Sequence, residues 1–338
     1  MKVAVLSFAH EKAAVYARLL RDMPGVDLVI ADPDAPDDPD DPARGRTMAR
    51  RLGVAYADGW DEVFALRPRA VVVTSEIARR RELVERAAEA GAHVLCAHPP
   101  ATEVADAREM VRACEDAGVR LTLASPACFG PAFGAVRRKL ADDETIGTLM
   151  TIQGACNSPR PHPSHPPRTP AEPAAAGALA ANAAVLLDMV DTVLGGEPAQ
   201  QVYAQANSVL GGEPGVESAA LVTVRYASGT VAALDCSRSP SAGRPAADGP
   251  TMTFVGDRGS VELDTAPRLL RGFATATAGE RWEAGGADAD AVMLGEFIAS
   301  VGNGHGAGPD GATGVRTLRI IRAAYASVAT GRPVDVGS

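Results

Sequence analysis

The first 125 residues alternate short apolar runs with amphipathic stretches, and this alternation restricts the fold more than any other feature. Five runs rich in β-branched residues are typical of buried strands: KVAVLSF, VDLVIAD, RAVVVTS, AHVLCA and VRLTLAS. The stretches between them, such as EKAAVYARLLRDM and ARRRELVERAAEA, place apolar residues at helical spacing. The sequence therefore predicts a doubly wound, parallel α/β domain of the Rossmann type over residues 1–125, with ligands at the carboxyl ends of its strands.

From about residue 147 the pattern changes. Runs such as TLMTIQGA, ALVTVRYAS and TMTFVGD alternate apolar with polar residues and indicate antiparallel strands. A helix-like stretch, GALAANAAVLLDMVDTVLGG, lies among them, and a second helix-like stretch closes the chain. We expect residues 126–338 to form an α+β domain with a large, mostly antiparallel sheet. The C-terminal segment of this domain can pack back on the first domain.

Composition argues against several classes of partner. The formal net charge of -9 and the lack of a basic stripe disfavour nucleic acid, which needs a clustered positive surface. The apolar run after Met1 and Lys2 is too short for a signal peptide and no stretch has the length of a membrane span, so we expect a cytoplasmic protein without a membrane partner. The five cysteines are dispersed without C-x-x-C spacing and are predicted to be buried thiols.

The turn after the first predicted strand is a candidate phosphate-binding site. A dinucleotide domain usually carries G-x-G-x-x-G there, so that backbone amides can approach the pyrophosphate. This chain reads SFAHEKA, with Ser7 and Ala9 at the first two glycine positions and Lys12 near the third. The small side chains leave some room and Lys12 can neutralise a phosphate. The alternative, that the turn has lost its ligand, stays open.

Asp32 ends the second predicted strand, where a carboxylate binds the ribose hydroxyls of an adenine nucleotide. The acidic run DPDAPDDPDDP begins at this residue and would repel a 2′-phosphate, although a solvated loop is the better explanation of the run itself. We therefore predict NAD rather than NADP as the cofactor. Because ligands bind at strand ends, Phe8, His10, Ser75 and Glu76 are assigned to the same candidate cofactor site.

Two further groups of residues can be interpreted in more than one way. His162 and His165 lie three apart in a proline-rich segment, but no acidic or cysteine partner stands nearby, and no metal site is predicted. The proline-rich segment, residues 157–173, contains too much proline for regular structure and is predicted to be a lid. Asp188 and Asp191 share one face of a helix, where one of them is either a site residue or part of a structural pair.

Together these segments resemble the Gfo/Idh/MocA family, the group of glucose-fructose oxidoreductase and inositol dehydrogenase. The resemblance covers nearly the whole chain and is carried by KVAVLSFAH, ELVERAAEAGAHVLCAHPPATEVADAREMVRACEDAGVRL and AAYASVATGRPVDV. It implies a nicotinamide cofactor, a small-molecule substrate between the two domains, and a homodimer or homotetramer formed through the second domain's sheet. The SFAH turn is similar to that of one branch of the family.

The resemblance also implies that the family's catalytic motifs are replaced. Where typical members have Glu-Lys-Pro, whose lysine orients the substrate and relays a proton, this chain has Ala-His-Pro with His98 at the centre. Where a family helix carries Asp and then His four residues on, this chain has Ala181 and Val185. Valine cannot exchange a proton. Asp188 matches a third, more structural acidic position, and it joins His98 as a candidate catalytic residue.

Three hypotheses about function follow. The first is a repurposed enzyme that keeps the fold and acts on a small metabolite without the conventional lysine and histidine. The second is an NAD-dependent dehydrogenase or reductase of a sugar, cyclitol or related carbonyl compound that uses His98, because imidazole titrates near neutral pH. The third is a non-catalytic homologue that binds a metabolite or a partner. The replaced motifs favour the first and third, whereas Asp32 and the SFAH turn favour a nucleotide ligand. His98 can also simply pack at a strand end.

Overall fold

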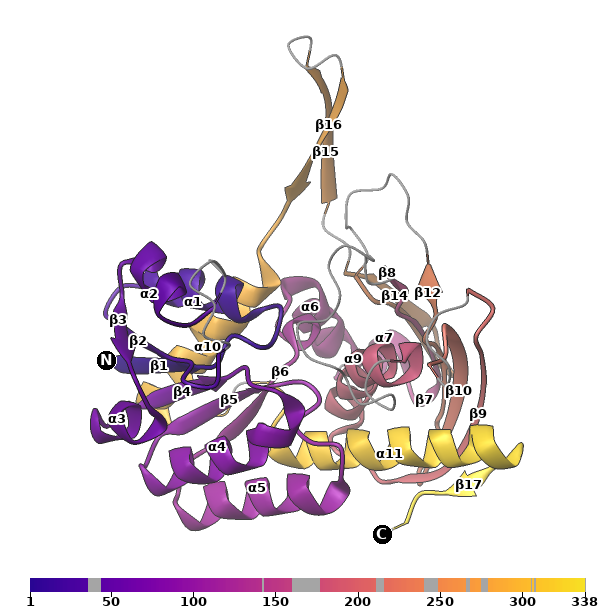
Figure 1. Ribbon diagram of the computed structural model, residues 1–338. Coiled ribbons are helices and arrows are strands. Elements are labelled where there is room, and N and C mark those ends of the chain that lie inside the picture. Colours follow the sequence, from indigo (N-terminus) through magenta and orange to yellow (C-terminus); the bar gives the residue numbers. More distant parts are fainter. Residues whose placement is uncertain are drawn as a thin grey trace. The chain divides into compact units, whose positions relative to one another are not determined.

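The computed structural model divides into two compact units, and Figure 1 shows the elements of each. The first unit comprises Met1–Pro126 and Asp290–Leu318. The second unit holds most of residues 127–289 together with the chain from Arg319 onward. The described residues are 1–35, 44–141, 143–159, 177–210, 216–239, 249–265, 268–274, 279–304, 306 and 308–337.

A six-stranded parallel sheet in the order β3-β2-β1-β4-β5-β6 forms the centre of the first unit. This confirms the predicted doubly wound architecture. The strands are β1 (Lys2–Leu6), β2 (Asp27–Ala31), β3 (Ala55–Ala57), β4 (Ala70–Val73), β5 (His93–Ala97) and β6 (Leu121–Ala124). The helices are α1 (Ala13–Arg21), α2 (Gly45–Leu52), α3 (Trp60–Ala65), α4 (Ile77–Glu89), α5 (Val104–Asp116) and, much later in the chain, α10 (Ala289–Asn303).

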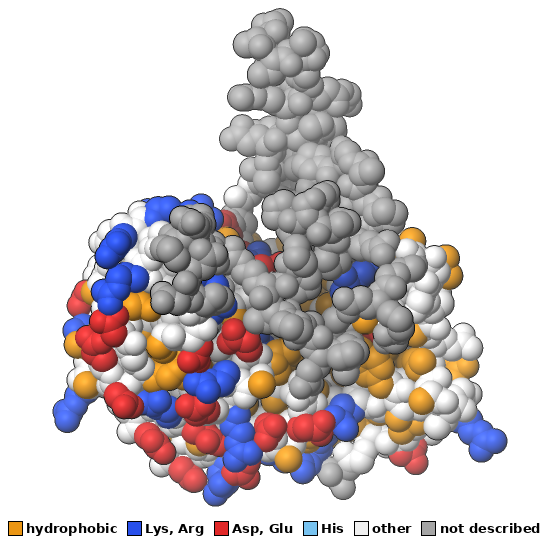
Figure 2. Space-filling model, viewed as in Figure 1, with side chains coloured by type: hydrophobic (Ala, Val, Ile, Leu, Met, Phe, Trp, Pro, Cys, Tyr) orange, Lys and Arg blue, Asp and Glu red, His pale blue; other side chains and the backbone are white. Residues whose placement is uncertain are grey.

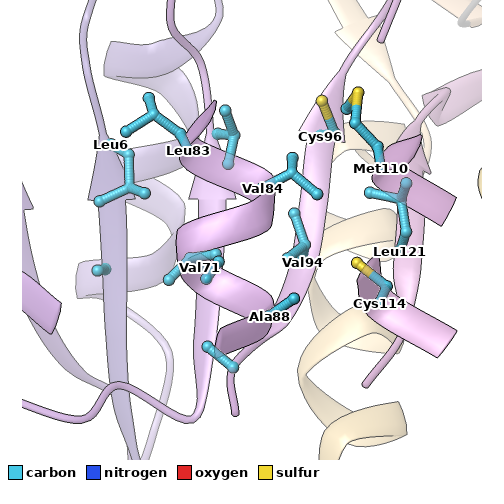
Figure 3. Close-up of a cluster of buried hydrophobic side chains, with 14 of the residues drawn as sticks. Leu6, Val71, Leu83, Val84, Ala88, Val94, Cys96, Met110, Cys114 and Leu121 are labelled. Carbon is cyan, nitrogen blue, oxygen red and sulfur yellow. The ribbon is translucent and has the colours of Figure 1, made fainter. Parts of the chain in front are cut away.

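Helices cover both faces of this sheet, with α4 and α5 on one face and α1 and α10 on the other (Figure 1). On the first of these faces, Leu83 and Val84 of α4 lie in one buried apolar cluster with Val71 and Val94 of β4 and β5 (Figure 3). A parallel sheet buried on both sides needs strands that are apolar throughout, and every residue of β4 is buried. The continuous β-branched runs in the sequence reflect this double burial.

The last third of the chain contributes to the edge of the same sheet. The Leu123 amide donates a hydrogen bond to the Pro309 carbonyl at 2.9 Å, and Thr122 forms an antiparallel bridge with Asp310. These contacts extend the sheet beyond β6. The first unit is therefore discontinuous in sequence.

The second unit contains a seven-stranded sheet in the order β14-β13-β7-β11-β10-β9-β17. All neighbouring pairs are antiparallel except β7 and β11, so the sheet is mixed and mostly antiparallel, as predicted. Its strands are β7 (Leu149–Ala155), β9 (Ala199–Asn207), β10 (Ala219–Tyr226), β11 (Val231–Asp235), β13 (Thr251–Gly256), β14 (Ser260–Asp264) and β17 (Val334–Asp335). Two small sheets pair β8 (Ser158–Pro159) with β12 (Arg238–Ser239) and β15 (Arg268–Ala274) with β16 (Gly279–Gly285).

Helix α9 (Ala178–Leu194) packs on one face of the large sheet, against β7, β10 and β11. Strand β10 alternates buried with less buried residues along its length, as expected of a strand with one covered and one open face. The other helices that involve this unit are α6 (Pro131–Leu140), α7 (Asp143–Ile146) and α11 (Gly311–Thr330).

Acidic and basic side chains intermingle on the face shown in Figure 2, over α4 and α5. Arg81 pairs there with both Glu85 and Asp106, at 2.7 and 2.8 Å. The five cysteines are buried. Among the described residues, no helix is both long and apolar enough to cross a membrane.

Candidate functional site

The candidate site lies at the carboxyl edge of the parallel sheet, where the strand order reverses between β1 and β4. Ser7, Asp32 and His98 directly follow β1, β2 and β5, and Ser75 lies two residues beyond β4. Carboxyl ends of parallel strands meet at one edge, and ligands of doubly wound domains bind beside the reversal. The structure thus brings these predicted site residues to one edge of one sheet.

Ser7 adopts the backbone conformation that usually requires glycine. Its φ is +70°, in the left-handed region, which costs a residue with a side chain about 1–2 kcal/mol. Neighbouring elements hold it there: its amide donates to the Ala31 carbonyl at 2.7 Å, and its carbonyl accepts from the Thr74 hydroxyl at 2.7 Å. Its own Oγ accepts a hydrogen bond from the Ala9 amide at 3.3 Å. The turn therefore keeps the shape of a glycine turn without the glycine.

Phe8, Ala9 and Lys12, which were predicted to contact the cofactor, are bound to other parts of the first unit. The side chains of Phe8 and Ala9 are buried and belong to the core. The Lys12 ammonium bonds to Asp290 of α10 at 2.9 Å, and the Tyr16 hydroxyl also bonds to that carboxylate. Lys12 is thus balanced by a carboxylate that no sequence pattern indicated, and a role for it beside a phosphate stays a prediction.

Asp32 and Arg44 form a buried, bidentate ion pair. Arg44 Nε lies 3.1 Å from Asp32 Oδ2, and Arg44 Nη2 lies 2.9 Å from Oδ1. The Gly45 amide, at the start of α2, donates to Oδ2 at 3.1 Å. Arg44 Nη2 also lies 3.5 Å from Ser7 Oγ and 3.7 Å from Glu76 Oε1. The predicted ribose carboxylate therefore already accepts three hydrogen bonds from its own chain.

Arg80 of α4 joins the loops that follow β4 and β5. Its Nε donates to the Ser75 carbonyl at 3.1 Å, and its Nη1 donates to the carbonyls of Ala97, at 3.0 Å, and Pro99. Burial lowers the pKa of this guanidinium. Because two of the three carbonyls flank His98, Arg80 fixes the turn that presents the imidazole. The His98 side chain itself is half-buried.

His10 lies near His98, and its surroundings keep its ring neutral. Its pKa is lowered to about 3, first by burial and then by electrostatic interactions with Arg80, Lys12 and the His98 imidazole. Its Nδ1 accepts a hydrogen bond from the Lys12 amide at 3.2 Å, so the neutral ring carries its proton on Nε2. His10 is therefore a neutral hydrogen-bond donor near neutral pH.

In the second unit, α9 carries the residues that the resemblance aligns with the family's Asp and His. Ala181 is exposed, Val185 is half-buried and Asp188 is fully buried. Asn182, which sequence reasoning missed, is buried beside Ala181 and donates to the Ser237 carbonyl at 2.9 Å. The catalytic assignment of Asp188 stays a prediction.

Arg44, Arg80 and Asp290 were also missed by sequence reasoning, because each acquires its role from partners that other elements of the fold bring to it. His162, His165 and nearly all of the predicted lid lie outside the described residues. Within the part of the chain that the structure describes, no three histidine, cysteine or acidic side chains stand close enough to hold a metal ion.

Comparison with known protein families decides the chain's membership. Residues 39–125 match the model of an oxidoreductase family with an NAD-binding Rossmann fold, GFO_IDH_MocA. Residues 136–262 match the GFO/IDH/MocA C-terminal domain. The chain belongs to the Gfo/Idh/MocA family. No curated protein matches it.

Solved structures share the fold of this Gfo/Idh/MocA chain over its whole length. A myo-inositol dehydrogenase from Corynebacterium glutamicum is 22% identical, with 100% of this chain and 99% of that chain covered and a TM-score of 0.77. GenD2 from gentamicin A biosynthesis, in complex with NAD, is 21% identical over 100% and 97% of the two chains, with a TM-score of 0.81. A levoglucosan dehydrogenase in complex with NADH and levoglucosan is 19% identical over 100% of both chains, with a TM-score of 0.78.

Proposed function

We propose that this chain is a nicotinamide-dependent oxidoreductase that acts on a small polar metabolite and uses His98 as its proton carrier. The observation that carries the proposal is the gathering of Ser7, Asp32, Glu76 and His98 at one edge of the parallel sheet, beside the strand reversal. A dinucleotide and a substrate need a phosphate turn, a ribose carboxylate and a titrating group at such an edge.

The residues at this edge fit a dinucleotide. The left-handed turn at Ser7 leads into α1, whose amino end is suited to a pyrophosphate. Asp32 directly follows β2, at the position of a ribose-binding carboxylate. When bound, a nicotinamide cofactor supplies the hydride donor or acceptor. The preference for NAD over NADP that Asp32 predicts depends on Arg44, which pairs with this carboxylate.

His98 is the better proton carrier of the two histidines at the site. In the oxidation of a secondary alcohol, a C–H bond breaks and its electron pair leaves as hydride, while the hydroxyl proton passes to a base. A base works best with a pKa near the working pH, and the pKa of His10, about 3, is too low for that task. We assign the proton to the His98 imidazole and the positioning of its turn to Arg80.

The substrate class that we propose is a sugar, a cyclitol or a related carbonyl compound. Support comes from the names of two similar structures, a myo-inositol dehydrogenase and a levoglucosan dehydrogenase. A second candidate function is a non-redox reaction on such a metabolite. It is favoured by Ala181 and Val185, which give α9 no titratable group at the two positions that the family resemblance singles out.

The experiment compares His98→Ala with His93→Ala, a matched control because His93 stands at the opposite end of the same strand. NADH binding is followed by fluorescence, and turnover is measured with a panel of sugars and cyclitols. We expect His98→Ala to lower turnover by about 10²–10⁴-fold while NADH affinity stays near that of the parent chain. His93→Ala should leave both unchanged.

Three outcomes would count against the proposal. Turnover that survives His98→Ala would remove His98 from the mechanism. Failure of the parent chain to bind NADH and NADPH, even at millimolar concentration, would remove the oxidoreductase function itself. NADH binding without turnover on any alcohol or carbonyl compound would favour the non-redox candidate.

A further inference from the structure

The hydrogen bonds of Asp32 leave little room for conventional ribose recognition. A carboxylate offers about four lone-pair sites, and three donors, Arg44 Nε, Arg44 Nη2 and the Gly45 amide, already use this one. A ribose bound through both its hydroxyls needs two sites. With Arg44 in place, this buried carboxylate has at most one acceptor site left, so Asp32 cannot accept both ribose hydroxyls.

The charge of Asp32 is changed as well as its hydrogen bonding. An unpaired carboxylate at this position excludes NADP because it repels the 2′-phosphate. Arg44 is buried against Asp32, where solvent screens the pair little, and its positive charge offsets the negative one. The repulsion between Asp32 and a 2′-phosphate is therefore weaker than that of an unpaired carboxylate.

Arg44 also has the chemistry and the position to contact a phosphate. A guanidinium presents five N–H donors in a planar fork that suits phosphate oxygens. This one extends from Asp32 towards Ser7, whose Oγ lies 3.5 Å from Nη2, and towards Glu76. It thus lies between the ribose carboxylate and the phosphate turn.

We propose that Arg44 determines the cofactor specificity of this chain: by pairing with Asp32, it lets the ribose site take NADPH as well as NADH. The inference rests on the proposed function, since it concerns the cofactor of that same site. Glu76, 3.7 Å from Arg44, adds a negative charge and limits the gain for NADPH. Acceptance of both cofactors, rather than a strict preference for NADPH, follows from this balance.

The test measures dissociation constants of NADH and NADPH by fluorescence titration and compares their ratio among variants. For the parent chain we expect the two constants to agree within about tenfold. Arg44→Gln keeps a donor beside Asp32 but removes the charge, and should shift the ratio by at least about tenfold towards NADH. Asp32→Asn should shift it towards NADPH.

Arg79→Gln is the matched control, because Arg79 pairs with Asp34 at 3.0 Å on the exposed surface. It should leave the ratio unchanged. Thermal melts of each variant check the fold, and the reciprocal shift in Asp32→Asn tests the idea independently if Arg44→Gln is unstable. A ratio that Arg44→Gln and Asp32→Asn leave unchanged, with NADH still bound, would overturn this inference alone. A parent chain that binds neither cofactor would overturn the proposed function and this inference together.

Discussion

At the scale of single residues, the site contrasts two histidines that share an edge of the sheet. Both are half-buried, but burial and nearby positive charges lower the pKa of His10 so that its ring stays neutral, whereas His98 lies in a turn that Arg80 holds through backbone carbonyls. The surroundings of His10, rather than its residue type, therefore make it unsuited to carry a proton near neutral pH.

The lowered pKa of His10 predicts a pH dependence of stability. The folded chain binds a proton at His10 near pH 3, whereas the unfolded chain does so near the ordinary value of 6.5. Between these values the unfolded state binds more protons, so the free energy of unfolding falls as the pH falls. Between about pH 7 and about pH 5, protonation linked to His10 should lower the free energy of unfolding by about 2 kcal/mol.

Urea denaturation at the two pH values measures this loss in the parent chain and in His10→Gln. The variant should lose about 2 kcal/mol less over the same interval, whatever its stability at neutral pH. His93→Gln serves as a control, because the pKa of His93 is lowered too but burial acts on it less strongly. Equal losses in the parent chain and in His10→Gln would contradict the assignment.

At the scale of elements, the strands that could be predicted are those buried on both faces, because such strands need a long continuous apolar run in the sequence. Strands β1, β2, β4, β5 and β6 follow continuous runs, whereas β3, only three residues long, carries too little pattern to be seen. The positions of Asp32 and His98 were predictable because each directly follows such a run. The pairing of Asp32 with Arg44 was not, since it depends on how α2 begins in space.

The amino end of α9 illustrates the same dependence on distant partners. Gly177 precedes the helix without a side-chain cap, and Glu217, from the segment before β10, takes that role. Its Oε1 accepts hydrogen bonds from the Leu179 amide at 2.8 Å and from the Tyr325 hydroxyl at 3.0 Å. A Cβ on Gly177 would overlap the Glu217 carboxylate. The glycine and the carboxylate therefore form one capping device.

We predict that Glu217→Ala lowers the free energy of unfolding by about 2 kcal/mol, because the helix end loses a charged acceptor. Gly177→Ala should also destabilise the protein, through the overlap with the carboxylate. Urea denaturation should show that the double variant loses less than the two single losses combined, since Glu217→Ala makes room for the new methyl group. Additive losses in the double variant would argue against the shared device. Tyr325→Phe is the control, because it removes the hydroxyl that donates to Glu217 but keeps the hydrogen bond between Glu217 and the Leu179 amide.

At the scale of the whole molecule, the large sheet of the second unit suggests self-association. Helix α9 packs on one of its faces. The other face carries Leu221 of β10, 62% exposed, and Tyr203 of β9, 36% exposed. Thr223 of β10 lies opposite Tyr203 in register and adds no charge. An open sheet face that presents such side chains is suited to a second copy of the chain, and we propose a homodimer or homotetramer built through it.

Light scattering coupled to gel filtration tests this assembly. The parent chain should elute as a dimer or tetramer, and Leu221→Glu should shift it towards the monomer, because a carboxylate would be buried in the contact. Val209→Glu is the matched control, since Val209 is 82% exposed but lies in the turn after β9. A monomeric parent chain, or a Leu221→Glu variant that stays assembled, would refute the proposed interface.

The discontinuity of the first unit has a consequence for synthesis on the ribosome. Strands β1 to β6 are complete by residue 124, but α10 and the Pro309 carbonyl that extends the sheet arrive much later. Lys12 meets its partner Asp290 only after the intervening residues of the second unit have been made. The amino-terminal unit is therefore the first to start but stays incomplete: the emerging chain carries it with an open sheet edge until the segment from Asp290 to Asp310 has been made.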